Sequence, residues 1–485
     1  MTATLSQRLR DHLSTRWSSL KPPGGKIENP IPLLRMLTFR QWMFFLVAFC
    51  GWTWDAFDFF TVSMTATEIA EALDVSVKDI TWGITLVLML RSVGALVFGL
   101  ASDKYGRKWP FIVNCVLFAV LELATGFVNT YQQFLGVRAL FGVAMGGIYG
   151  NCAATALEDC PIEARGIISG MLQEGYAFGY LLAVVFDRAL VTTTAHGWRT
   201  LFWFGAGPPV LIIAFRMVLP ETDAYMAQRH LERTSKADEF KQQAKKAWHE
   251  YWHIMVYLVV IMAGFNFMSH GSQDLYPTML KSQLNFSTDK TTVTMVVANL
   301  GAIAGGIFFG HLSEYFGRRS SIMFCCVLGG ALIYPWAYVR NNGIMAAVFF
   351  LQFAVQGAWG IVPIYLSELS PPAFRAFIVG IAYQLGNLAS SASSTIETTI
   401  GERFPLPAAA DGSSRYDYAE VMAIFMGCVF VFLFVVTFLG PEKHSVELAV
   451  DAPFERYDGD ADGLEGDVVK MGSHHHNEKL ADDRV

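Results

Sequence analysis

The chain has 485 residues, of which 53% are hydrophobic and 16% charged, with a net charge of −6 and a mean hydropathy of +0.36. A soluble globular domain carries about 25% charged residues, so the composition excludes an ordinary soluble protein and indicates a membrane protein. The seven cysteines show neither C-x-x-C pairs nor the spacing of a secreted scaffold, which argues against a metal site or a disulfide framework.

Long apolar stretches recur from residue 41 to residue 439. Each has about twenty residues, the length needed to cross a bilayer core of about 30 Å. Continuous apolar runs favour helices over the alternating strands of a β-barrel. We therefore predict twelve transmembrane helices, over residues 41–63, 79–101, 109–128, 131–155, 166–189, 199–219, 253–280, 291–313, 320–339, 342–366, 374–395 and 418–439.

Positive charges indicate which side each loop faces. Lys and Arg are concentrated in the N-terminal 40 residues, around Arg107 and in the long loop after the sixth span. Cytoplasmic loops carry this excess, so we expect both termini in the cytoplasm. The plasma membrane is the expected location of the protein. The expected organisation is a cytoplasmic N-terminal tail (1–40), a six-helix bundle (41–219), a cytoplasmic linker loop (220–252), a second six-helix bundle (253–440) and a disordered cytoplasmic C-terminal tail (441–485).

The two halves of the chain repeat the same loop motifs. GLASDKYGRK at 99–108 follows the second span, and GHLSEYFGRR at 310–319 follows the eighth. The pattern E-x-x-P-x-x-x-R follows spans four and ten, at 158–165 and 368–375, and Pro-Glu follows spans six and twelve. These matched positions indicate an internal duplication, and hence two pseudo-symmetric bundles.

The pattern G-x-x-x-D-K-x-G-R-K, with its second copy, resembles the signature loop of the major facilitator superfamily. The resemblance extends over about residues 40–440 and implies an all-α membrane protein of the major facilitator fold, whose two bundles rock about a central site. Glycines in this loop let helices approach closely, and Gly106 permits a tight turn. The second copy has Glu314 where the first has Asp103, which keeps the carboxylate. The residues expected to form this conformational-gating loop are Gly99, Asp103, Gly106, Arg107, Gly310, Glu314, Gly317 and Arg318.

A polar stripe interrupts the apolar seventh span at NFMSHGSQDLYPT, residues 266–278. Residues four apart on a helix share a face, so Asn266, His270 and Asp274 form one stripe. An intramembrane His or Asp is costly unless it lines a cavity or has a partner. One interpretation is a polar cluster that only holds helices together, and the favoured one is the wall of a path for substrate and ions. The polar residues that reach a similar depth from other spans are Asp55, Asp58, Arg91, Gln384 and Asn387.

The stripe, written N-x-x-S-H-x-S-Q-D-x-x-x-T, resembles the signature of the Jen family, the fungal carboxylate–proton symporters of the sialate–proton symporter group. WTWDAFDFF at 52–60 and AYQLGN at 382–387 are also similar to that family. The resemblance implies that three stripe residues matter for transport and that three further residues occupy binding or translocation positions. The first set is Asn266, His270 and Asp274, and the second is Arg91, Gln384 and Asn387.

Side-chain chemistry independently supports a carboxylate as substrate. The guanidinium of Arg91 is planar and always charged, and it can offer two donors to a carboxylate. The alternative is that Arg91 pairs with a buried acid such as Asp55, Asp58 or Asp274, and the two roles can alternate. Amide side chains can bond the carboxylate or a hydroxyl group of the substrate. The expected substrate-binding residues are Arg91, Asn266, His270, Gln384 and Asn387.

Proton coupling needs a group that titrates near physiological pH. The imidazole of His270 does so without perturbation, and burial can bring carboxyl groups into the same range. The His270–Asp274 pair is favoured because an acid four residues along the helix can orient the imidazole, although Asp274 could instead act as a gate. The expected proton-coupling residues are His270, Asp274, Asp58 and Glu174, and relay and structural roles stay open for Glu122, Glu174 and Arg138.

These features predict a secondary active transporter that moves a small carboxylate of the lactate, pyruvate or acetate type into the cell with a proton, by alternating access. No enzyme activity, metal or cofactor is expected, because no nucleophile–base pair, metal-ligand set or G-x-x-x-x-G-K-[ST] nucleotide loop stands out. The expected partners are the substrate, the proton and the lipid bilayer, without nucleic acid, and cytoplasmic lysines could take ubiquitin. The alternatives are a sialic acid or other sugar-acid–proton symporter and a transporter-like nutrient receptor.

Overall fold

The structure is a computed structural model of the chain. It describes residues 14–442, except residues 19, 23–28, 76, 192, 228–236, 342, 372–374, 392, 402 and 408–414. Most of the expected C-terminal tail (441–485), parts of the N-terminal tail and the middle of the linker loop therefore lie outside the described residues.

Almost all the described elements are α-helices. Those of the first half are α2 (Pro30–Arg35), α3 (Phe39–Met64), α4 (Ala66–Leu73), α5 (Val77–Tyr105), α6 (Lys108–Thr125), α7 (Tyr131–Gly146), α8 (Ile148–Leu157), α9 (Arg165–Gln173), α10 (Gly175–Phe186), α11 (Trp198–Gly205) and α12 (Gly207–Val218). Those of the second half are α14 (Ala237–Gln273), α15 (Tyr276–Thr278), α16 (Thr288–Phe316), α17 (Arg318–Tyr338), α18 (Gly343–Trp359), α19 (Val362–Leu369), α20 (Arg375–Ser390), α21 (Ser393–Gly401) and α22 (Tyr418–Leu439). Two short strands, β1 (Pro405–Leu406) and β2 (Arg415–Tyr416), pair antiparallel between α21 and α22.

Within the described part of the chain, ten helices are long and apolar enough to cross a membrane. The predicted spans five and eleven are not among them. Each is formed by two shorter helices, as are spans four, six and ten. The helices α9 and α10 meet at Glu174, and residues 391–392 separate α20 from α21. Both broken spans contribute to the site described below.

The helix α14 begins at Ala237, well before the predicted start of the seventh span at residue 253. Residues 237–252 are rich in Ala, Glu, Gln and Lys and contain neither Gly nor Pro, so nothing in their composition stops a helix. The second part of the predicted linker is therefore helical. At its other end α14 stops at Gln273, one residue before Asp274.

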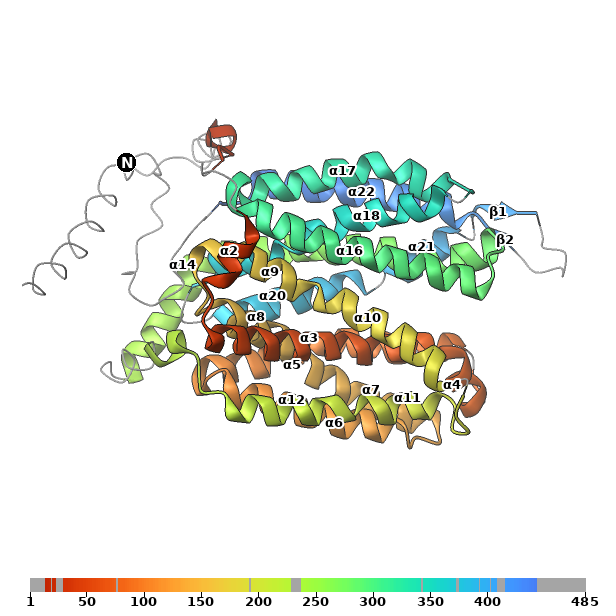
Figure 1. The fold of residues 1–485 in the computed structure, drawn as a ribbon, viewed down its shortest axis with the longest axis horizontal. Coiled ribbons are helices and arrows are strands. Elements are labelled where there is room, and N and C mark those ends of the chain that lie inside the picture. The colour runs from red at the N-terminus through yellow and green to blue at the C-terminus, as the bar shows by residue number, and fades with distance from the viewer. Residues whose placement is uncertain are drawn as a thin grey trace, which may run out of the picture. The chain divides into compact units, whose positions relative to one another are not determined.

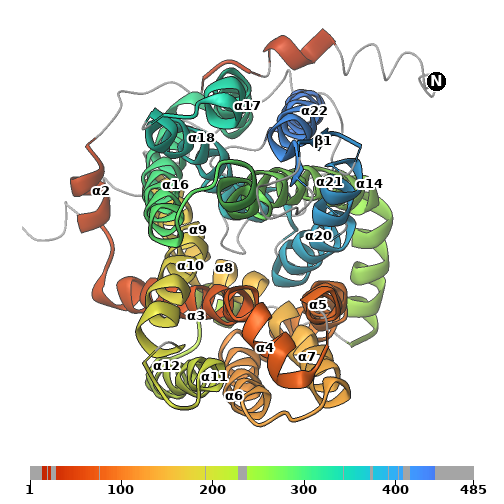
Figure 2. The same cartoon turned by 90° about the vertical axis from the view of Figure 1, so that its right-hand side faces the viewer.

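The two halves of the chain form two groups of helices (Figure 1). Figure 2, turned by 90°, shows α3, α6, α7, α11 and α12 in one group and α16, α17, α18 and α22 in the other. Contacts of α5 with α20 and of α9 with α16 join the two groups. Two helices of the first half thus pack directly on two helices of the second.

The first signature loop is held by a network of buried ion pairs. Arg107 donates to Asp103 at 2.6 Å and to Glu158 at 2.7 Å. Glu221, from the Pro-Glu motif after the sixth span, accepts from the backbone N–H of Lys108 at 3.0 Å. The three motifs that repeat in the sequence therefore meet at one place.

The second signature loop reproduces this network. Arg318 donates to Glu314 at 2.7 Å and to Glu368 at 3.0 Å. Glu442, from the second Pro-Glu motif, accepts from the backbone N–H of Arg318 at 2.8 Å. Glu314 takes the place of Asp103, as its carboxylate predicts.

The same two acids also join the halves at this end of the helices, which we call the signature-loop end. Asp103 accepts from the backbone N–H of Phe377 at 2.9 Å, in the first turn of α20. Glu314 accepts from the backbone N–H of Gly166 at 2.8 Å, in the first turn of α9. Each acid satisfies a free N–H at a helix N-terminus of the opposite half. In this conformation the halves are therefore closed against each other at the signature-loop end.

Gly317 precedes α17 with φ 87° and ψ 152°, a backbone conformation open essentially to glycine alone. We expect Gly317→Ala to lower the free energy of unfolding by about 1–3 kcal/mol, measured by thermal or denaturant unfolding of the protein in detergent. Gly330→Ala is the matched control, because Gly330 lies inside α17 and an added Cβ would meet no atom within 4 Å. Equal stability of the two variants would contradict this explanation.

Candidate functional site

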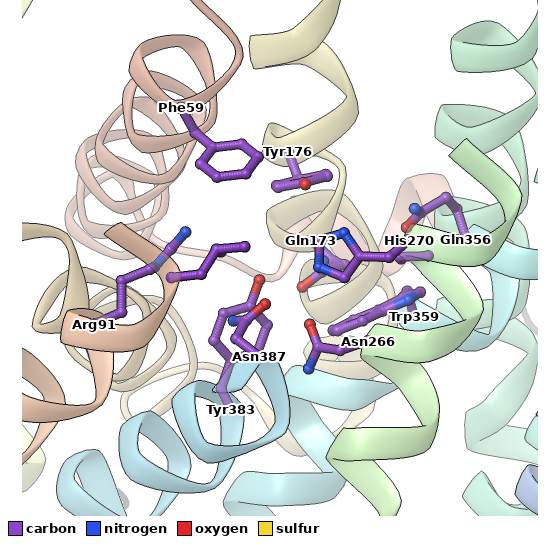
Figure 3. A pocket seen from close by; sticks show the side chains of 12 residues that line it. Phe59, Arg91, Gln173, Tyr176, Asn266, His270, Gln356, Trp359, Tyr383 and Asn387 are labelled. Carbon is purple, nitrogen blue, oxygen red and sulfur yellow. The ribbon is translucent and has the colours of Figure 1, made fainter. Parts of the chain in front are cut away.

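A narrow cavity lies between the two halves of the protein. Figure 3 shows Arg91 on one side of it and His270, Gln356 and Trp359 on the other. Its free volume is about 10 Å³, room for about one water molecule, so a larger solute needs the halves to move apart. The lining residues are Phe59, Leu88, Arg91, Gln173, Tyr176, Asn266, Ser269, His270, Gln356, Trp359, Tyr383 and Asn387.

The structure brings together most of the expected substrate-binding residues. Arg91, Asn266, His270 and Asn387 line the cavity, whereas Gln384 does not. Gln384 is fully buried and accepts a hydrogen bond from Nδ2 of Asn387 at 3.1 Å. It therefore positions Asn387 at the cavity wall.

His270 and Asp274 form the pair expected from their spacing. Nδ1 of His270 lies 3.0 Å from Oδ2 of Asp274, and the side chains are 9% and 33% exposed. The backbone N–H of Asp274 still donates to the carbonyl of His270 at 3.0 Å, so the helical geometry continues past the end of α14. Asp274 thus orients a buried imidazole and remains partly open to solvent itself.

Arg91 pairs with Asp55, one of the acids left open as its partner. Nη2 of Arg91, on α5, lies 2.8 Å from Oδ2 of Asp55, on α3, and both side chains are buried. The pair is held by a single contact, because Nε of Arg91 and Oδ1 of Asp55 have no hydrogen-bond partner. The guanidinium therefore keeps donor capacity for a second anion.

Asp58 lies inside the first half and is not among the lining residues. Its carboxyl group is fully buried, and neither oxygen has a hydrogen-bond partner. A Cβ added at Gly205 would lie 3.1 Å from Oδ1 of Asp58 and 3.2 Å from Cγ of Glu122. Glu122 pairs with Arg138 at 3.4 Å. Asp58, Glu122 and Arg138 thus form a buried polar cluster behind the cavity wall.

Glu174 lies at the junction of α9 and α10, against the second half. It is 3% exposed, and neither carboxyl oxygen has a hydrogen-bond partner. A Cβ added at Gly306, on α16, would lie 1.8 Å from Oε1 of Glu174, so only a glycine leaves room for this side chain. The neighbouring Gln173 lines the cavity. Glu174 therefore connects the cavity wall to the interface between the halves.

Aromatic rings close the cavity toward the signature-loop end. Tyr149 of the first half stacks on Tyr383 of the second at 4.0 Å between ring centroids, with an angle of 19° between the planes. Trp52 and Trp359 pack around them at 4.9 Å from Tyr149 and 5.9 Å from Tyr383. Within the described ranges no group of three or more His, Cys, Asp or Glu side chains is placed to hold a metal ion.

Sequence reasoning missed several of the lining residues. Gln173 and Gln356 are polar residues inside apolar spans, and this signal could have identified them. The rings of Tyr176, Trp359 and Tyr383 carried no such signal, because aromatic residues are common throughout the apolar spans. Only the structure shows that these three rings line the cavity.

Two bundles with repeated loop motifs around a polar central cavity are the architecture of a secondary transporter. Residues 37–450 match the family described as "Sugar (and other) transporter". The chain is 42% identical over 482 residues to the carboxylic acid transporter protein homolog of Saccharomyces cerevisiae, covering 94% of this chain and 78% of that relative. The protein therefore belongs to the sugar and other transporter family of the major facilitator superfamily, and the resemblance to the Jen family is confirmed.

More distant relatives agree with this assignment. The sialic acid transporter NanX of Escherichia coli is 24% identical over 379 residues, covering 77% of this chain and 89% of NanX. The solved proton:xylose symporter XylE superposes with a TM-score of 0.65 at 16% identity, covering 84% of this chain and 97% of that structure. The human organic anion transporter MFSD10 superposes with a TM-score of 0.62 at 12% identity, covering 82% of this chain and 99% of that structure. The predicted fold class, an integral membrane protein of the major facilitator fold, is confirmed.

The buried Arg91–Asp55 pair yields a stability prediction. Asp55→Asn leaves the guanidinium buried without its counter-charge, so we expect the protein to lose about 3–5 kcal/mol of stability, measured by unfolding in detergent. The control is Asp289→Asn, which breaks the exposed Arg188–Asp289 contact at 3.7 Å and should change stability little. An Asp55→Asn protein as stable as the control would show that the pair does not stabilise this conformation.

Proposed function

We propose that this protein carries a small carboxylate and a proton together across the plasma membrane into the cell. The observation that carries the proposal is a cavity with an arginine on the wall from one half and a His–Asp pair on the wall from the other. Arg91 offers a permanent positive charge, and His270 offers a proton-binding nitrogen. The similarity to a carboxylic acid transporter homolog supports the same substrate class.

The substrate carboxylate is proposed to bind Arg91 at the donors that Asp55 leaves free. Asn266 and Asn387 line the same cavity and would bond the second oxygen or a hydroxyl group of the substrate. When the site is empty, Asp55 holds the guanidinium in place.

The proton is proposed to bind at the His270–Asp274 pair. Asp274 is partly exposed and can exchange protons with solvent, while His270 is buried at the cavity wall. Asp58 and Glu174 are further candidates, because each is a buried carboxyl group without a hydrogen-bond partner. A proton on either carboxyl group removes a negative charge that is costly to keep in a low-dielectric interior.

Transport is proposed to follow alternating access, with the signature-loop end facing the cytoplasm, where Lys and Arg concentrate. Release into the cell then requires the contacts of Asp103 with α20 and of Glu314 with α9 to break. The stacked rings of Tyr149 and Tyr383 must separate in the same step. Gating by the signature loops thus rests on contacts between the two halves.

The first test is uptake of labelled lactate into proteoliposomes that contain only this protein, with and without an inward proton gradient. We expect accumulation that requires the gradient and collapses with a protonophore. Saturable accumulation would also exclude a receptor that does not transport. Absence of lactate entry, with proton-driven entry of sialate in the same vesicles, would move the substrate to the sugar acids.

The proton pair is tested by His270→Ala and Asp274→Asn in the same vesicles. We expect both to lose gradient-driven accumulation, because the imidazole or its counter-charge is removed, while the purified proteins stay folded. The control is His196→Ala, which removes an exposed histidine packed on Trp203 outside the cavity. Normal acid-stimulated uptake by both pair variants would move the proton site to another group.

A further inference from the structure

A buried acid outside the sequence-predicted site lies beside the His270–Asp274 pair. Glu397 is in α21, the second part of the broken eleventh span. Its side chain is fully buried, and neither carboxyl oxygen has a hydrogen-bond partner. Unlike the buried acids of the signature loops, it has no arginine beside it in any contact of the described residues.

The surroundings of Glu397 place it against the polar stripe of α14. A Cβ added at Gly271 would lie 3.2 Å from Oε1 of Glu397, and Gly271 directly follows His270. The same Cβ would lie 2.5 Å from the ring of Phe425, on α22. Glu397 therefore occupies a space between an apolar ring and the backbone of the stripe.

Few charged groups face Glu397 from the two helices that pack against α21. From α14 and the turn after it, the titratable groups are His270 and Asp274, and Asp274 acts on Glu397 by charge repulsion. On α22, Tyr418 lies against Gly401, one turn further along α21, and Glu420 accepts from the hydroxyl of Tyr338. None of these supplies a positive charge unless His270 is protonated.

Ionising both Asp274 and Glu397 at the same time is costly, because the two negative charges repel each other. A buried carboxylate without donors loses its solvation and gains nothing in return. Asp274 has the imidazole of His270 at 3.0 Å and partial exposure to solvent, so it bears the negative charge more easily. Of the two acids, Glu397 is therefore the one that is buried as a neutral, protonated acid.

We infer that Glu397 is a further proton-binding residue of the transport site, acting with His270 and Asp274. The inference rests on the proposed proton-coupled function. A proton that passes from Glu397 to Asp274 breaks one O–H bond and forms another, and the negative charge moves the opposite way. Together, His270, Asp274 and Glu397 hold one proton more than the His–Asp pair alone. That additional proton contributes to the pH dependence of transport.

The protonation state of Glu397 can be measured without substrate. We expect the infrared spectrum of wild-type protein minus Glu397→Gln, at neutral pH, to contain the carbonyl stretch of a protonated carboxyl group. The matched control, Glu420→Gln, makes the same change at an acid that accepts a hydrogen bond, and its difference spectrum should lack that band. Carboxylate bands in the Glu397→Gln difference spectrum would overturn the inference. If the amide variant does not fold, Glu397→Asp should shift the carbonyl band of the protonated acid, and a shift confined to carboxylate bands would overturn the inference.

Transport then tests whether this proton is used. Each proton coupled to a transport step changes the rate of that step by about tenfold per pH unit. We expect Glu397→Gln to lose one coupled proton. Its lactate uptake should therefore rise about tenfold less per pH unit of acidification than that of the wild type. A Glu397→Gln protein with the wild-type pH profile would refute the role of Glu397 even where the band is present. Wild-type vesicles without gradient-driven uptake would instead refute proton symport, and the spectra would still decide the state of Glu397.

Discussion

The cost of burying charge away from water is the constraint on which this arrangement depends. Several buried arginines are each accompanied by an acid, as Arg91 is by Asp55 and Arg138 is by Glu122. Where a buried acid has no such partner, the neutral form is the one that costs least. Among the buried acids that the structure describes, those with neither oxygen hydrogen-bonded are Asp58, Glu174 and Glu397. Pairing therefore holds the scaffold together, and the unpaired acids are the places where a proton can be stored.

Because the chain is duplicated, each half neutralises its own buried arginine at the signature-loop end. In each half an arginine is neutralised by two acids, and one of those acids also reaches a helix N-terminus of the other half. The ion pairs within a half are buried. Asp103 and Glu314 are each bonded to the opposite half by a single hydrogen bond, and Arg375 of α20 adds a longer contact of 3.9 Å with Glu158. Breaking two such bonds costs far less than breaking the pairs. The halves can thus separate here without losing their own structure.

Much of this arrangement could be predicted from the sequence, because the relevant signals are local. Helix periodicity placed His270 and Asp274 on one face, and the repeated motifs paired the two signature loops before their contacts were known. The role of Gln384 could not be predicted, since depth along a helix does not say whether a side chain faces the cavity or a neighbouring amide. Glu174 was found as an intramembrane acid, but its fit against Gly306 depends on a contact between the halves. Glu397 was missed because the predicted span ended at residue 395, before the second part of a broken helix.

The net charge of the cavity gives a physical reason for the proposed coupling of a carboxylate to a proton. Arg91 and Asp55 cancel each other, so a carboxylate bound between them and the opposite wall adds one net negative charge. The interior screens that charge poorly, and closing the halves over it removes the water that would stabilise it. A proton taken up at the His270–Asp274 pair cancels the excess and lets the loaded cavity close at a cost similar to that of the empty one. The carboxylate alone or the proton alone leaves the cavity with an unbalanced charge, so each favours closure only in the presence of the other.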